Sequence, residues 1–178
     1  RHRAELTASG ELAQRRKQQL LRWMWQMVEI ELMSALRAHP QVKAIAAEKG
    51  AVVKTIGDAV MATFIRPEHA IVAGLRMREA MKELNRQRGK EDLIVKIGIH
   101  EGPCLAVMLN ERQDYFGQTV NIAARVQSLS TSQEIHITGP VIDAPGVANI
   151  LDKEAIRPIQ KEAALRGIAD KIVVYEIP

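Results

Sequence analysis

A turn of glycine and aspartate between two apolar segments is the feature that most constrains the fold of this chain. Ala51–Thr55 and Ala59–Phe64 contain several β-branched residues, and Ile56, Gly57 and Asp58 separate them. Glycine tolerates the positive φ that a tight turn needs, so this spacing predicts a β hairpin. The fold must therefore hold an antiparallel pair of strands at this position.

Other patterns predict that helices and strands alternate along the chain. A helix should begin near Pro67 and end at Gly89, with apolar or small residues spaced three and four apart at Ala70, Gly74, Met77, Met81 and Leu84. A second helix is expected over Thr119–Gln127, and strands over Leu93–His100, Pro103–Leu109, Asp114–Phe116, Glu134–Thr138 and Lys171–Ile177. This order predicts an α+β fold with a largely antiparallel sheet.

Residues 1–40 are predicted to form a leading helical segment before a globular unit over 41–178. Leu12–His39 is apolar around most of a helix, and Pro40 should end it. Polar residues interrupt Leu20–Leu36, so we expect no transmembrane segment. Residues 1–22 hold six basic and two acidic residues, but aromatic residues are only 3% of the chain. We therefore expect a solvated helix start and no nucleic-acid partner.

Composition favours one globular domain in a reducing compartment. The 178 residues are 47% hydrophobic, which is enough to bury one core. Cys104 is the only cysteine, so no disulfide can form within the chain, and we expect a cytoplasmic location. The chain begins with Arg1 rather than methionine, and we expect further residues upstream.

Two segments carry side chains suited to a nucleotide and a metal. Asp58 follows a glycine at the predicted hairpin tip, a good position for Mg²⁺, which takes one or two carboxylates and completes its shell with phosphate and water. Asn121 and Arg125 are four residues apart on a predicted helix, so they share a face where they suit a phosphoryl group. Taken alone, Asp58 is better explained as an ordinary turn residue, and an Asn/Arg pair at this spacing is common on solvated helix faces.

The order of these motifs resembles the catalytic domain of class III nucleotidyl cyclases, in particular bacterial adenylate cyclases. The matching segments are Val52–Asp58, Ile97–Pro103, Asp114–Arg125, Leu165–Ile168 and Val173–Glu176, and the resemblance covers about residues 47–178. It implies a ferredoxin-like sheet covered by helices, in a head-to-tail homodimer with active sites at the interface. It also implies that the ribose 3′-oxygen of ATP attacks the α-phosphate, with two Mg²⁺ or Mn²⁺ ions as cofactors. The products would be cyclic AMP and pyrophosphate.

The resemblance also implies which residues recognise the base. Lys54 and Asp114 would read adenine, because adenine offers an amine to the Asp114 carboxylate and a ring nitrogen to Lys54. Guanine carries a carbonyl oxygen where adenine carries its amine, which would leave the carboxylate facing another acceptor. An unpaired buried group costs about 1–3 kcal/mol, so we expect ATP to be preferred over GTP.

The remaining roles concern the metal, the ribose and the phosphates. By the resemblance, Asp58 would bind metal, Asn121 would position the ribose, and Arg125 would stabilise charge on the α-phosphate. Arg166 stands where many family members have a lysine, and we expect a weaker contact to the triphosphate from it.

One departure from the family pattern leaves two functions open. The family carries its first metal-binding aspartate on an initial strand, but no aspartate precedes Asp58 in this chain. Either that strand lies upstream of Arg1, or a metal loop is missing from the sequence, or the domain has lost catalysis. The first hypothesis is an adenylate cyclase domain. The alternative is an inactive cyclase-like module for dimerisation or nucleotide sensing. The basic, apolar leading helix further predicts a coupling to an upstream regulatory domain.

Overall fold

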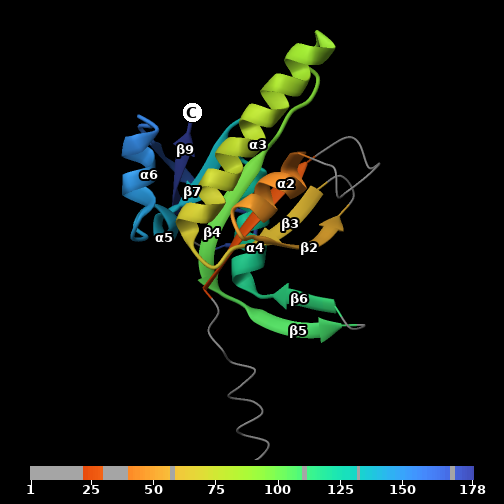
Figure 1. Cartoon of the computed structure of the whole chain (residues 1–178). Helices are drawn as coiled ribbons and strands as arrows, with labels where there is room; N and C mark the ends of the chain where they lie inside the picture. The colour runs from red at the N-terminus through yellow and green to blue at the C-terminus, as the bar shows by residue number, and fades with distance from the viewer. Residues whose placement is uncertain (1–21, 30–39, 57–58, 110–111, 132, 169–170) are drawn as a thin grey trace, which may run out of the picture.

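The computed structural model describes residues 22–29, 40–56, 59–109, 112–131, 133–168 and 171–178 (Figure 1). The strands in these ranges are β1 (Arg22–Glu29), β2 (Ala51–Ile56), β3 (Ala59–Thr63), β4 (Ile97–Pro103), β5 (Leu105–Leu109), β6 (Arg112–Phe116), β7 (Ile135–Thr138), β8 (Ile159–Ala163) and β9 (Ile172–Ile177). Seven of them form one sheet in the order β2-β3-β1-β4-β7-β9-β8, and β5 pairs with β6 separately. Every pair is antiparallel except β4 with β7.

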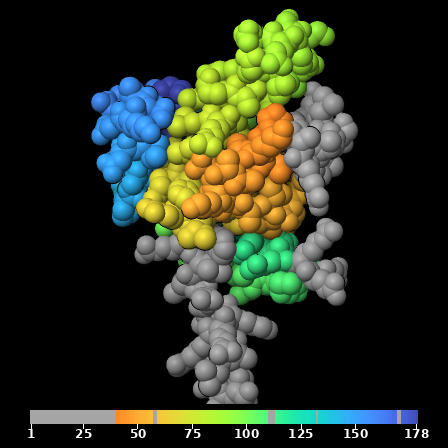
Figure 2. All heavy atoms as spheres, in the orientation of Figure 1, coloured from red at the N-terminus to blue at the C-terminus, as the bar shows by residue number. Residues whose placement is uncertain are grey.

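Helices cover both faces of the large sheet. They are α2 (Pro40–Ala47), α3 (Pro67–Arg88), α4 (Gln118–Gln127), α5 (Gly139–Ile142) and α6 (Val147–Lys153). The main core joins α2, α3, α5 and α6 to one face through the isoleucines of β4 and β7. In the space-filling view α3 runs along this face, with α2 on one side of it and α6 on the other (Figure 2). The helix α4 packs on the opposite face, where Val126 contacts Val174 of β9.

Successive side chains of a strand point to opposite faces of the sheet, so one sheet contributes to a core on each face. Ile97 and Ile99 are fully buried in the core beneath α3. Gly98, between them, faces α4, because a Cβ added there would lie 2.2 Å from the backbone nitrogen of Gln127. Among the helices described, none is both long and apolar enough to cross a lipid bilayer.

The predicted hairpin and the helix after it are confirmed. β2 and β3 pair antiparallel on either side of residues 57–58. α3 begins at Pro67 and ends at Gly89, whose φ of 64° lies in the left-handed region that glycine tolerates. Ala70, Gly74 and Met77 are buried along this helix, as their spacing predicts.

The predicted helix over Leu12–His39 is wrong at residues 22–29, which form β1. This strand lies between β3 and β4 and pairs with both, so partners distant in sequence satisfy its backbone. A short apolar run can have the same composition in a helix and in a central strand, so periodicity could not separate them. A strand therefore precedes the hairpin, where the sequence analysis predicted none. The division of the chain at residue 40 stays a prediction.

Several boundaries also differ from expectation. Pro40 begins α2, in agreement with the preference of proline for a first helical turn, and residues 30–39, over which the predicted helix should end, lie outside the described residues. β4 covers Ile97–Pro103 rather than Leu93–His100, because β1 pairs with it as far as Pro103. The sequence analysis did not predict the edge strand β8, whose residues are mostly exposed and show no apolar alternation.

Candidate active site

Lys54 of β2 and Asp114 of β6 are in direct contact, although 60 residues separate them. The Nζ of Lys54 lies 2.7 Å from Oδ2 of Asp114 and 5.7 Å from the centre of the Phe116 ring. The side chains of Lys54 and Asp114 are 37% and 17% exposed, so a ligand can reach both. The structure thus brings together the two residues that the sequence analysis assigned to base recognition.

The surroundings of Asp114 keep its carboxylate ionised. Burial acts to raise the pKa of Asp114, but the Lys54 hydrogen bond, the Tyr115 N–H and the charge of Lys54 together lower it below its usual value. The Tyr115 N–H donates to Oδ1 at 2.8 Å, so both carboxylate oxygens have a donor. An ionised carboxylate accepts hydrogen bonds only, and this matches the exocyclic amine of a base.

Local structure explains how the pair is oriented. The register of β2 against β3 shifts between Val52 and Lys54, and an irregularity of this kind re-aims the side chains that follow it. Tyr115, beside Asp114, is 5% exposed and packs with Met61 and Ala123. The strand β6 is thereby anchored to β3 and α4, which fixes the backbone that carries Asp114.

A second group of candidate residues lies at α4. Asn121 is exposed and Arg125 is partly buried. A Cβ added at Gly167 would lie 3.4 Å from Nη2 of Arg125, so the turn after Leu165 packs against the guanidinium. Arg166, in that turn, is exposed. Two permanently charged groups thus belong to neighbouring segments, an arrangement suited to a polyphosphate.

Contacts at the start of α4 fix the helix that carries Asn121 and Arg125. The hydroxyl of Thr119 donates to the carbonyl oxygen of Pro103 at the end of β4. Gly117 precedes the helix with a φ of 131°, a conformation that favours glycine. Among the described residues, no hydrogen bond or ion pair joins Arg125 or Arg166 to the Lys54–Asp114 pair. The two groups of candidates nevertheless lie on neighbouring elements, because Tyr115 of β6 and Ala123 of α4 pack in one cluster with Met61.

The predicted metal ligand Asp58 lies outside the described residues, but the strand that follows it is described. The Cα of Ala59, at the start of β3, is opposite the Cα of Glu29, at the end of β1. The backbone therefore places a carboxylate-bearing position of β1 beside the hairpin that contains Asp58. Sequence reasoning missed this position because it searched for an aspartate on a strand and predicted a helix there.

Comparison with known proteins identifies the family. The family described as adenylate and guanylate cyclase catalytic domain matches residues 24–175. An adenylate cyclase of Anabaena cylindrica is 31% identical over 150 residues, which are 76% of this chain and 29% of that protein. Guanylate cyclase 32E of Drosophila melanogaster is 35% identical over 98 residues, 48% of this chain and 8% of that protein. The chain therefore spans less than a third of either relative.

Solved structures agree with the fold. The adenylyl cyclase CyaB from P. aeruginosa has a TM-score of 0.70 at 23% identity and covers 88% of this chain and 93% of its own. The guanylate cyclase domain of RhGC from Catenaria anguillulae, in complex with GTP, has a TM-score of 0.67 at 19% identity, with 89% and 97% covered. This chain belongs to the class III adenylate and guanylate cyclase family and has its mixed α+β catalytic-domain fold. The family acts as phosphorus–oxygen lyases and uses divalent metal ions.

Proposed function

We propose that this chain is an adenylate cyclase catalytic domain that converts ATP to cyclic AMP and pyrophosphate. The contact between Lys54 and Asp114 supports this proposal most directly, because it pairs a donor with an ionised acceptor at an accessible position. The similarity to the Anabaena cylindrica adenylate cyclase, over 76% of the chain, points in the same direction.

Base selectivity follows from the hydrogen-bonding pattern of the pair. Adenine can donate its exocyclic amine to Asp114 and accept from Lys54 at a ring nitrogen. Guanine would present an oxygen to the Asp114 carboxylate, and an unpaired acceptor in a half-buried site costs about 1–3 kcal/mol. The Asp114→Asn variant carries an amide that can donate to this oxygen, so it should turn over GTP better relative to ATP.

The phosphate chemistry is assigned to α4 and the turn that follows β8. The ribose 3′-hydroxyl gives up its proton to solvent, and its oxygen forms a bond to the α-phosphorus while the bond to the pyrophosphate oxygen breaks. In this proposal Asn121 orients the ribose, Arg125 stabilises charge that develops on the α-phosphate, and Arg166 contacts the triphosphate. When bound, two divalent ions would activate the 3′-hydroxyl and neutralise the phosphates.

We assign the metal ligands to Asp58 and, as the second carboxylate, to Glu29. Mg²⁺ commonly uses one or two protein carboxylates, and the register that sets Glu29 opposite Ala59, the residue after Asp58 in the sequence, supports this assignment. Glu29→Gln and Asp58→Asn should each raise the Mn²⁺ concentration needed for half-maximal binding, measured by Mn²⁺ electron paramagnetic resonance with ATP present. Glu154→Gln, an exposed glutamate after α6, is the matched control.

The first experiment measures cyclic nucleotide formation from ATP and from GTP, with Mg²⁺ or Mn²⁺. We expect cyclic AMP as the main product and loss of activity in Asp58→Ala. Equal turnover of both nucleotides would contradict the base assignment. ATP binding without product would support the alternative of an inactive nucleotide-sensing module, which the absence of an aspartate from β1 favours.

A further inference from the structure

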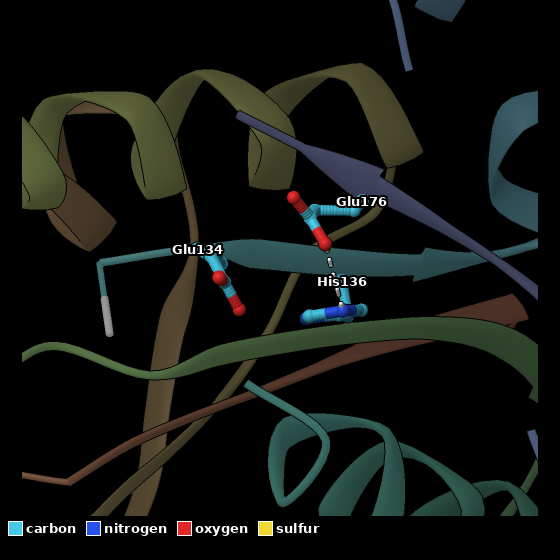
Figure 3. Close-up of side chains that lie close together, drawn as sticks. All are labelled: Glu134, His136 and Glu176. Carbon is cyan, nitrogen blue, oxygen red and sulfur yellow. Dashed lines mark ion pairs between the residues drawn. The ribbon is translucent and has the colours of Figure 1, made fainter. Parts of the chain in front are cut away.

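Two glutamates and one histidine lie close together on the α4 side of β7 and β9, several strands away from Lys54 on β2 (Figure 3). Glu134 directly precedes β7, His136 lies within it, and Glu176 is opposite His136 on β9. One ligand atom from each residue lies within 4.8 Å of the other two. In the sheet order, β1 and β4 separate β7 from the strand that follows Asp58. This group therefore needs an explanation of its own.

His136 is buried without the interactions that a buried imidazole normally makes. It is 3% exposed, and its Nδ1 has no hydrogen-bond partner in the described part of the chain. Its Nε2 points at the Glu176 carboxylate from 3.8 Å, which is too long for a hydrogen bond. Leaving a buried polar atom unpaired usually costs about 1–3 kcal/mol. The side chain is thus placed for a partner that its neighbours do not provide.

The two carboxylates are held in place by other groups. Glu134 accepts hydrogen bonds at 3.1 Å from both the backbone N–H and the hydroxyl of Thr131. Glu176 is 12% exposed at its side chain and forms an ion pair with Lys161 of β8. Lys161 is half exposed, so it can swing into solvent without disturbing the strands. When His136 is neutral, the charges of Glu134, Glu176 and Lys161 leave the cluster with a net charge of minus one.

We propose that Glu134, His136 and Glu176 form a binding site for a zinc-type divalent cation. One imidazole and two carboxylates from a rigid sheet are a ligand set that zinc accepts, with water in the fourth position. Zinc–ligand bonds of about 2.0–2.2 Å require ligand atoms roughly 3–3.5 Å apart, so small side-chain rotations would close the set. Mg²⁺ binds imidazole poorly, which separates this site from the nucleotide metals.

The position of His136 in the sheet also suits a metal ligand. Gly98, the register partner of His136 on β4, is where the backbone of α4 packs on the sheet. A cation here would tie β7 to β9 beside the end of the helix that carries Arg125.

Zinc titration by calorimetry tests the site directly. The background is Asp58→Asn, so that the proposed nucleotide metal site does not contribute. We expect one equivalent of Zn²⁺ to bind, with affinity at least tenfold weaker in His136→Gln and unchanged by excess Mg²⁺. The matched control is His69→Gln. His69 is a partly buried histidine on α3 near the Glu48 carbonyl, and this variant should bind zinc as the background does.

A second variant makes the test independent of folding defects at a buried position. Lys161→Gln removes the surface cation that competes for Glu176, so the affinity for Zn²⁺ should rise severalfold. Zinc at a hundredfold excess over Kd should also raise Tm by about 5–10 °C. Unchanged affinity in Lys161→Gln, equal losses in His136→Gln and His69→Gln, or competition by Mg²⁺ would overturn the proposal. None of these readouts depends on cyclase activity.

Discussion

In the free chain Lys54 and Asp114 form an ion pair, which a nucleotide base would have to replace with its own hydrogen bonds. A partly exposed ion pair contributes only about 0–1 kcal/mol, so replacing it with hydrogen bonds to a base costs little. The contact nevertheless holds both side chains in one place before the ligand arrives. Preorganisation of this kind lowers the entropy cost of binding.

Arg125→Ala should reduce turnover much more than nucleotide binding. A preorganised donor aimed at charge that develops in the transition state typically contributes 10²–10³ in rate, about 2.7–4 kcal/mol. Steady-state kinetics with ATP, together with Kd for a non-hydrolysable ATP analogue, measure the two effects. Arg157→Ala removes an exposed arginine that pairs with Asp152 and serves as control. Unchanged kcat in Arg125→Ala would remove Arg125 from the proposed role.

His100 should make the fold less stable in mild acid. Burial lowers its pKa to about 4, while the unfolded chain has an ordinary value near 6.5. As pH falls below 6.5, the unfolded state takes up a proton that the folded state does not, so stability falls. Between pH 7.5 and pH 5, His100 should lower the free energy of unfolding by about 2 kcal/mol.

Urea unfolding at pH 7.5 and pH 5 measures this effect. His100→Gln keeps a group that can bond to the Thr138 hydroxyl, which lies 2.8 Å from Nδ1, but it cannot titrate. The variant should lose less stability over the same pH range. An equal loss in the variant and the parent chain would assign the acid sensitivity to other groups.

At the scale of elements, the approach of α4 to β4 fixes where Arg125 lies. Gly98 allows the helix backbone to lie directly on the strand, and Thr119 ties the start of the helix to Pro103. The register shift in β2 and the packing of Tyr115 likewise set the positions of Lys54 and Asp114. Local contacts between neighbouring elements therefore set the position of each group of candidate residues.

Gly98→Ala should destabilise the domain and displace α4. The new Cβ would lie 2.2 Å from the Gln127 nitrogen and 2.7 Å from the Ala123 carbonyl oxygen, and backbone atoms cannot move aside separately. Overpacking of this kind typically costs about 1–3 kcal/mol, which chemical denaturation can measure. Gly139→Ala, where nothing lies within 4 Å of the added Cβ, should be nearly neutral. Equal stability of the two variants would show that α4 does not need this contact.

At the scale of the whole molecule, the proposed head-to-tail homodimer would combine metal ligands of one protomer with base and phosphate residues of the other. Tyr115, beside Asp114, and Ala123, on the helix that carries Arg125, pack in one cluster with Met61, so one protomer can supply both base and phosphate contacts, as this division requires. Two symmetric sites would then share one interface.

Mixing two inactive variants tests this arrangement. Asp58→Ala and Arg125→Ala should each lack activity, but their heterodimer would hold one site with both substitutions and one intact site. An equal mixture should recover about a quarter of the parent activity, as expected for random pairing across a two-fold axis. Cyclic AMP assays at increasing protein concentration provide the measurement. No recovery in a mixture that dimerises would argue for sites within single protomers.

The sequence by itself determined the features that depend on neighbours along the chain. The glycine turn fixed the β2–β3 hairpin, and Pro67 and Gly89 fixed the ends of α3, because turn and cap preferences act over a few residues. The motif order also indicated the family, which the match over residues 24–175 confirms.

Only the tertiary structure decided the features that depend on distant partners. Residues 22–29 became a central strand because β3 and β4 supply hydrogen bonds on both sides, and no local pattern records those partners. The contact between Lys54 and Asp114 and the cluster around His136 likewise join separate strands. Hydrophobic periodicity reports which face is buried, whereas strand pairing and side-chain contacts arise only when the whole sheet has assembled.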